Sequence, residues 1–239
     1  MLLVPLIPPA RMQKRLSILL MLLLTSVATG LAGNPLASVD PADGWKLVSQ
    51  SGNLALYSRV REGSPLKEFR GVGEIDASTP AVLAVIDDVP NYPKFMPYTE
   101  ECRVLKSEGT STVVYQRLSP KICCDRDYTL RITRKSWPTA SGVAFLNSWT
   151  PINELGPPEQ RGVVRIKKCD GSWFLEPTVS GKTRATYSVY ADSAGAIPSF
   201  LANHASQVGI GKIFTAVRKQ VKDPRYEMLA SERPTNPGS

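Results

Sequence analysis

The residues of this chain best suited to chemistry are its four cysteines, two of which are adjacent. The segment ICCDRD contains Cys123 and Cys124, while Cys102 precedes it and Cys169 follows it. These spacings lack the paired two-residue gaps of a zinc ribbon, so we predict no metal and no cofactor. Two interpretations remain: a reactive thiol pair, or structural disulfides that link Cys123 and Cys124 to Cys102 and Cys169.

The N-terminal segment decides between these interpretations. Three basic residues, Arg11, Lys14 and Arg15, precede the apolar run LSILLMLLLTSVATGLAG, which ends in small residues. This order is typical of a secretory signal peptide, so we predict that residues 1–33 are a signal peptide and that the protein is periplasmic or secreted. The alternative is an uncleaved segment that anchors the protein to a membrane. Export favours the disulfide interpretation, because disulfides persist outside the cytosol.

Histidine chemistry and nucleic-acid binding are both disfavoured. His204 is the only histidine, and no acidic motif accompanies it, so we expect neither a catalytic triad nor a zinc hydrolase. Without residues 1–33, which hold three basic and no acidic residues, the formal net charge falls from +8 to +5. This excess suits transient contact with an anionic membrane surface, but no basic cluster is dense enough for nucleic acid. We expect a monomer.

The rest of the chain is predicted to form one domain over residues 45–223, between a leader at 34–44 and a flexible tail at 224–239. Alternating segments predict a hairpin over 54–60 and 67–76, and a capped apolar segment predicts a helix over about 78–88. Further strands are predicted at 99–108, 110–118, 126–136, 142–149, 162–178 and 182–192.

One long helix is predicted over residues 197–223, with Pro198 in its first turn. Its apolar residues form two separate stripes: Leu201, Ala205 and Val208, then Ile213, Phe214, Val217 and Val221. Gly209 and Gly211 lie between the stripes, where a bend or close packing would reconcile them.

The order of these elements predicts an α+β helix-grip fold, a curved antiparallel β-sheet wrapped around a long C-terminal helix. Six pieces of the chain occur in an order that is typical of one known family: VVYQRL (113–118), RDYTLR (126–131), RGVVR (161–165), WFLEP (173–177), KTRATYSVYADSAGAIP (182–198) and VRKQV (217–221). On these pieces the chain resembles the START (StAR-related lipid-transfer) domain family over about residues 45–222.

This resemblance implies an enclosed apolar cavity that holds one lipid during transfer. Burial of a lipid chain contributes about 0.8 kcal/mol per methylene. Several family members carry a cavity arginine where this chain has Ile132, and Tyr115 stands at about the place of that arginine's acidic partner. We therefore expect a neutral lipid such as a sterol, hopanoid or acylglycerol, with a phospholipid as the alternative.

Candidate residues follow from these expectations. The predicted ligand-binding residues are Tyr115, Ile132, Phe145, Trp149, Phe174, Phe200, His204 and Phe214. A gate or membrane-contact loop is predicted to involve Tyr92, Phe95, Met96, Gly209 and Gly211, although the first three could simply pack. We expect a lipid carrier rather than an enzyme; the alternatives are a polyketide cyclase or aromatase of the same superfamily, or a lipid-sensing interaction module.

Overall fold

The computed structural model describes residues 43–120, 123–192 and 197–232. The predicted signal peptide and most of the predicted leader lie outside these residues. Within the described ranges, no helix has both the length and the apolar character that a membrane crossing requires.

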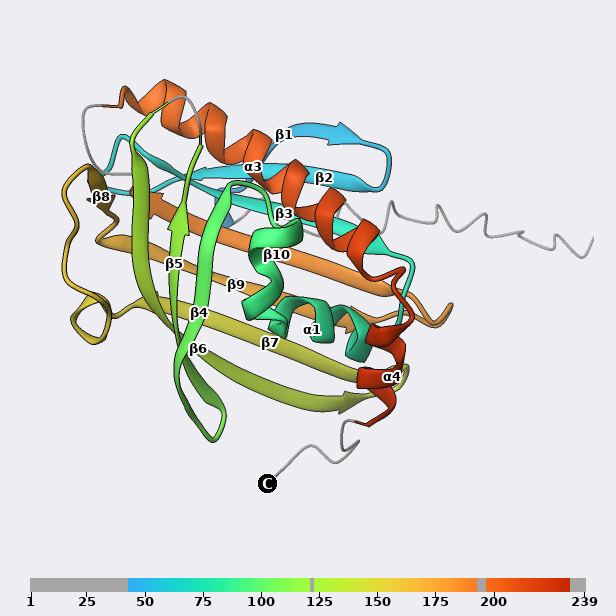
Figure 1. Cartoon of the computed structure of the whole chain (residues 1–239). Helices are drawn as coiled ribbons and strands as arrows, with labels where there is room; N and C mark the ends of the chain where they lie inside the picture. Colours follow the sequence, from blue (N-terminus) through green and yellow to red (C-terminus); the bar gives the residue numbers. More distant parts are fainter. Residues whose placement is uncertain (1–42, 121–122, 193–196, 233–239) are drawn as a thin grey trace, which may run out of the picture. The chain divides into compact units, whose positions relative to one another are not determined.

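A single ten-stranded sheet dominates residues 43–232 (Figure 1). Nine strands are antiparallel to their neighbours in the order β1-β2-β3-β10-β9-β7-β6-β5-β4, and β8 pairs in parallel with the start of β6. The predicted helix-grip fold is confirmed. The strands are β1 (Lys46–Ser51), β2 (Leu54–Val60), β3 (Lys67–Ile75), β4 (Thr99–Glu108), β5 (Ser111–Leu118), β6 (Asp125–Thr139), β7 (Gly142–Pro151), β8 (Val163–Arg165), β9 (Lys168–Pro177) and β10 (Thr183–Asp192).

The helices lie against one face of this sheet (Figure 1). Helix α1 (Thr79–Asp87) begins where Ser78 accepts a hydrogen bond from the amide of Ala81, as an N-cap should. A 3₁₀ turn, η2 (Val89–Asn91), and the short α2 (Tyr92–Phe95) follow α1 directly. The remaining helical elements are η3 (Asn153–Leu155), α3 (Ser199–Gln220) and α4 (Arg225–Ser231).

Glycines in β3 let α3 approach the sheet closely. A Cβ on Gly71 would lie 2.6 Å from Ile210 Cγ2, and one on Gly73 would lie 2.9 Å from the Phe214 ring. Both glycines therefore mark the sheet face that α3 covers, which we call the inner face. Because side chains alternate along a strand, Arg70 and Val72 belong to the opposite, outer face. Residues paired across neighbouring strands lie on the same face. The registers of β3 with β10, β10 with β9, β9 with β7 and β7 with β6 therefore assign the residues of these strands to the inner or the outer face.

The prediction of a flexible tail from residue 224 is wrong for residues 225–231, which form α4. Tyr226 is completely buried, and its hydroxyl donates to Asp88 Oδ2 at 2.8 Å at the end of α1. An isolated aromatic in a polar segment shows no periodicity, so this docking depends on a long-range contact that the local pattern does not encode.

Candidate ligand-binding site

A chain of aromatic rings crosses the inner face from β7 to α3. Trp149 contacts Tyr187 at a centroid distance of 5.5 Å, Tyr187 contacts Trp173 at 4.8 Å, and Trp173 contacts Phe214 at 5.3 Å. Gly171 makes room for the first of these rings, because a Cβ there would lie 2.3 Å from Trp149 Cζ2. The inner face therefore presents a continuous aromatic surface beneath α3. It includes the predicted residues Trp149 and Phe214.

Apolar side chains around these rings are only half-buried, although they pack against the main core. They come from α2 and the loop after it, from β6 and β7, and from β10: Phe95, Met96, Ile132, Phe145, Tyr187 and Val189. This set places the predicted residues Ile132 and Phe145 beside the aromatic chain. It also shows that Phe95 and Met96 pack toward the core.

The tyrosine hydroxyls of the inner face remain uncharged. Burial raises the pKa of Tyr92, Tyr128 and Tyr187 above the usual value for tyrosine. Tyr128 donates to Gln116 Oε1 at 2.9 Å, and Tyr92 donates to the carbonyl of Ile86. These groups can exchange hydrogen bonds with a ligand but cannot serve as bases near neutral pH.

An ion pair that the sequence analysis missed also lies on the inner face, beneath the end of α1. Arg134 Nε donates to Asp87 Oδ1 at 3.1 Å, and Asn147 Nδ2 lies 3.2 Å from the same oxygen. Asn147 is only 3 % exposed, and its Oδ1 has no hydrogen-bond partner in the described part of the chain. Arg134 could have been noticed in the sequence, since it alternates in phase with Ile132 along β6.

The placement of Tyr115 in the ligand site is wrong. Tyr115 is fully buried, but it faces outward, since its neighbour Val114 packs on the inner side with Val89 and Cys102. Its hydroxyl donates to Asp127 Oδ2 at 3.2 Å.

Asp127 itself is held by a neighbouring cation. Arg165 of β8 binds both carboxylate oxygens, with Nε 2.7 Å from Oδ1 and Nη2 2.9 Å from Oδ2. This buried, bidentate pair fixes β8 beside the start of β6, where the two strands run parallel. Asp127 is therefore structural.

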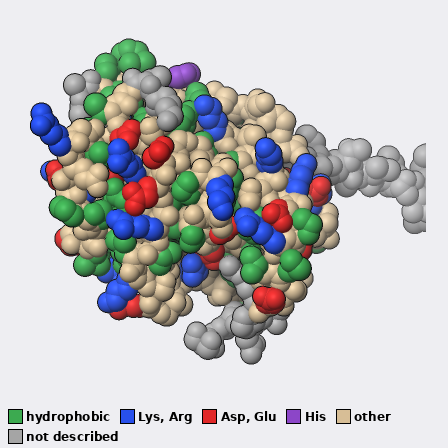
Figure 2. Space-filling view, viewed as in Figure 1, with side chains coloured by type: hydrophobic (Ala, Val, Ile, Leu, Met, Phe, Trp, Pro, Cys, Tyr) green, Lys and Arg blue, Asp and Glu red, His purple; other side chains and the backbone are tan. Residues whose placement is uncertain are grey.

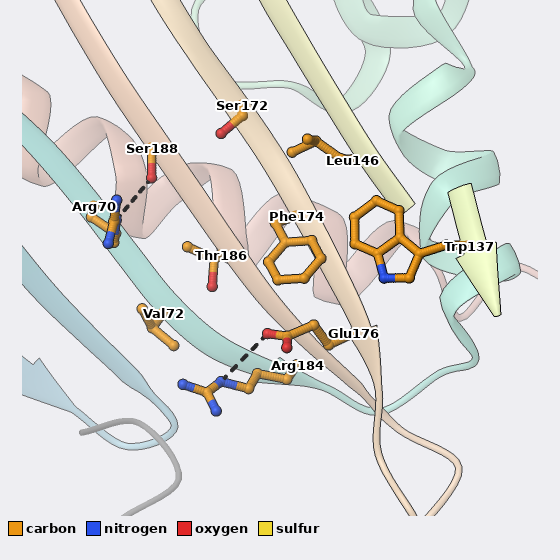
Figure 3. A pocket seen from close by; sticks show the side chains of 10 residues that line it. All are labelled: Arg70, Val72, Trp137, Leu146, Ser172, Phe174, Glu176, Arg184, Thr186 and Ser188. Atoms are coloured by element: carbon orange, nitrogen blue, oxygen red, sulfur yellow. Dashed lines mark hydrogen bonds and ion pairs between the residues drawn. The ribbon is translucent and has the colours of Figure 1, made fainter. Parts of the chain in front are cut away.

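The prediction for Phe174 is also wrong, because its ring lies on the outer face in a groove of about 480 Å³ (Figure 3). Its ring stacks on Trp137 at 5.6 Å, and the groove between β3 and β6 is otherwise lined largely by polar side chains. Arg70 Nε donates to Ser188 Oγ at 3.0 Å across its floor. Phe174 lies between Trp173 and Leu175 in the sequence. Because three successive residues are apolar, no alternation of apolar and polar residues indicates which of them faces inward.

The first predicted stripe of α3, Leu201, Ala205 and Val208, does not face the sheet, although Ala202 in the same half of the helix is buried. Phe200 is 69 % exposed, Leu201 and Val208 are also exposed, and His204 lies at the surface, where Figure 2 shows its imidazole. Phe200 and His204 therefore do not line the inner face. The second predicted stripe is buried at Phe214, Val217 and Val221.

Helix α3 continues without interruption through Gly209 and Gly211. A Cβ at either position would meet no heavy atom within 4 Å, so neither glycine serves close packing. The next residue, Lys212, bonds the Tyr98 hydroxyl through Nζ at 2.6 Å. The middle of α3 is thus tied to the loop that follows α2.

The predicted disulfides are not formed. All four cysteines carry free thiols: Cys102 and Cys169 are buried, while Cys123 and Cys124 are exposed. Cys102 packs with Val89 and Val114, whereas Cys169 belongs to the main core cluster. The two buried cysteines thus belong to different clusters, and the adjacent exposed pair lies apart from both clusters; sequence spacing alone could not show this.

Comparison with known proteins identifies relatives of this chain. Residues 75–218 match the family described as polyketide cyclase / dehydrase and lipid transport. An uncharacterized protein of Pseudomonas aeruginosa is 32 % identical over 187 residues, which cover 78 % of this chain and 88 % of that protein. The phosphatidylcholine transfer protein of Rattus norvegicus is 23 % identical over 167 residues, 70 % of this chain and 78 % of that protein.

Solved structures show the same arrangement. A STAR-related lipid transfer protein fragment from Xanthomonas axonopodis superposes with a TM-score of 0.68 at 28 % identity, covering 76 % of this chain and all of the fragment. Human STARD10, at 18 % identity and a TM-score of 0.65, shares the fold over 80 % of this chain and 78 % of its own.

Proposed function

This chain belongs to the polyketide cyclase / dehydrase and lipid transport family, and from that premise we propose that it binds one lipid on the inner face and transfers it between membranes. The observation that carries the proposal is the aromatic chain under α3, together with apolar neighbours whose surface is only partly buried. Covering that surface with a lipid chain removes it from water, at about 25 cal/mol per Å².

The polar groups of the inner face favour a neutral headgroup. Arg134 is already paired with Asp87, so a phosphate would compete with an existing carboxylate. The buried Oδ1 of Asn147 offers an acceptor that a lipid hydroxyl could satisfy. We therefore place the headgroup beside Arg134 and Asn147, and we favour a sterol, hopanoid or acylglycerol over a phospholipid.

Loading requires contact with a membrane, for which the first turns of α3 are suited. Phe200 and Leu201 expose large apolar side chains there, and Lys67 of β3 lies next to them, since its amide donates to Asn203 Oδ1 at 3.0 Å. We also propose a periplasmic or secreted location. This part of the proposal depends on residues 1–33, which lie outside the residues that the structure describes.

The first experiment is native mass spectrometry of the protein purified gently from its own host, followed by extraction and identification of the bound molecule. A stoichiometric neutral lipid is the expected result. A phospholipid would contradict the headgroup argument but not the carrier function. A protein that arrives empty and takes up no sterol, acylglycerol or phospholipid would exclude the carrier function, and product formation from polyketide substrates would then be tested.

A pair of neighbouring substitutions tests the location of the site. We expect Ile132→Asp, on the inner face, to lower lipid affinity at least about tenfold, because a buried carboxylate is strongly disfavoured beside an apolar chain. Thr133→Asp places the same charge on the outer face of β6 and serves as the matched control. Vesicle-to-vesicle transfer and circular dichroism are measured for both variants. Equal loss of transfer in two folded variants would show that the lipid does not bind at the inner face.

A further inference from the structure

The exposed cysteine pair has surroundings unlike those of the two buried cysteines. Cys123 and Cys124 lie between β5 and β6, and both are exposed. The guanidinium of Arg126 reaches back from β6, with Nη1 2.9 Å from Cys123 Sγ and 2.6 Å from the carbonyl oxygen of Cys124. Of the two thiols, it is therefore Cys123 whose sulfur lies against the cation.

Arg126 is positioned by the fold. The residue is only 7 % exposed, and its backbone lies in register with Leu118 of β5. The neighbouring carboxylate of Asp125 is engaged by Arg117, with the Nη2–Oδ2 distance 2.6 Å. A nearly buried cation thus directs an N–H group at an exposed sulfur, where it can stabilise the negative charge of the attacking sulfur during thiol–disulfide exchange.

We propose that Cys123 is a site of S-thiolation by low-molecular-weight disulfides. The Cys123 thiolate attacks one sulfur of the reagent, and the new protein–reagent S–S bond forms as the reagent's own S–S bond breaks. The other half of the reagent leaves as a thiolate and takes up a proton, while the proton of Cys123 has passed to solvent. Cys123 is oxidised, and the leaving half is reduced.

This inference is independent of lipid binding, because it depends only on the β5–β6 connection and Arg126. We do not expect Cys123 and Cys124 to bond to each other, because a disulfide between adjacent residues strains the peptide between them. Burial raises the pKa of Cys102 and of Cys169 to about 12, so these thiols are internal references for unreactive cysteine.

The test uses the full chain, reduced and then treated with oxidised glutathione at pH 7. Peptide mass spectrometry over time gives a separate rate for each cysteine. We expect Cys123 to react about tenfold faster than Cys124, and Cys102 and Cys169 to react only after unfolding in urea. A parallel experiment with neutral iodoacetamide at pH 7 should show faster alkylation of Cys123 than of Cys124.

Two variants assign the effect to the guanidinium. Arg126→Gln should lower the rate at Cys123 to that of Cys124, whereas Arg126→Lys, which retains a cation, should keep part of the difference. Circular dichroism shows whether each variant folds. If neither variant folds, the difference in rate between Cys123 and Cys124 in the wild-type chain still tests the proposal. The proposal is overturned if the two cysteines react equally in the wild type, if Arg126→Gln folds and leaves the rate unchanged, or if the only product is a Cys123–Cys124 disulfide.

Discussion

At the scale of single residues, neighbouring positions of β6 have different roles because their side chains lie on opposite faces of the sheet. Asp127 points outward and is neutralised by Arg165, which stabilises the junction with β8. Tyr128 points inward and contributes an uncharged hydroxyl to the proposed lipid site. The Arg-Asp pair of the sequence is therefore divided: Arg126 contacts Cys123, whereas Asp127 serves the fold.

Removal of one partner of the buried pair should be costly. We expect Asp127→Asn to lower the free energy of unfolding by about 3–5 kcal/mol, because Arg165 would stay buried without its counterion. Asp125→Asn breaks the more exposed pair with Arg117 and should cost about 1 kcal/mol or less. Urea unfolding of both variants gives the two values. Similar losses would show that the buried pair contributes no more than a surface pair.

At the scale of elements, the glycines of β3 and of α3 have opposite roles. Gly71 lets α3 approach the sheet, whereas Gly209 and Gly211 lie in a helix with open space around them. The half of α3 beyond these glycines is fixed by Phe214 and Val217, while the half before them is largely exposed. We propose that the first half of α3 is the part that moves during lipid exchange.

Alanine substitutions test that division. Gly71→Ala should destabilise the protein by about 1–3 kcal/mol, because its Cβ would collide with Ile210 and Phe214. Gly211→Ala should stabilise it by about 0.5–1 kcal/mol through helix propensity, and it should slow lipid transfer if α3 flexes there. Thermal unfolding and vesicle transfer are measured together. A Gly211→Ala variant that is stabilised but transfers lipid at the wild-type rate would exclude flexing at this glycine.

For the whole molecule, burial of uncharged ionisable groups links stability to alkaline pH. Cys102 and Cys169 have pKa values of about 12 in the folded protein, against 9.0 for an exposed thiol. Between these values the unfolded chain has lost protons that the folded chain keeps, so the unfolded state binds fewer protons and stability falls as pH rises.

We therefore expect the free energy of unfolding to fall from about pH 9 upward, with each thiol contributing about 1.4 kcal/mol per pH unit in the steepest range. Urea unfolding under reducing conditions at pH 7.5, 9 and 10.5 measures this slope. Cys102→Ala should reduce the slope, while Cys169 and the buried tyrosines maintain the rest. A slope unchanged in that variant would show that Cys102 does not titrate as described.

The sequence by itself determined the types of the elements and the fold. Strand alternation, the capped helix before residue 88 and the apolar stripe at Phe214, Val217 and Val221 are local patterns, and local periodicity is encoded directly in the chain. The resemblance to START domains added the expectation of a lipid site beneath the long helix. Ile132, Phe145, Trp149 and Phe214 belong to or pack against the main core cluster, and their role in lipid binding stays a prediction.

Only the tertiary structure decided which face several residues take and what they contact. Tyr115 and Phe174 were assigned to the wrong face because cross-strand register depends on contacts between distant segments. The pairing of Arg134 with Asp87 and the docking of Tyr226 on Asp88 join residues 47 and 138 positions apart. The same reason explains the cysteines: the predicted export favoured disulfides, but the fold places Cys102 and Cys169 in different clusters and Cys123 against a cation.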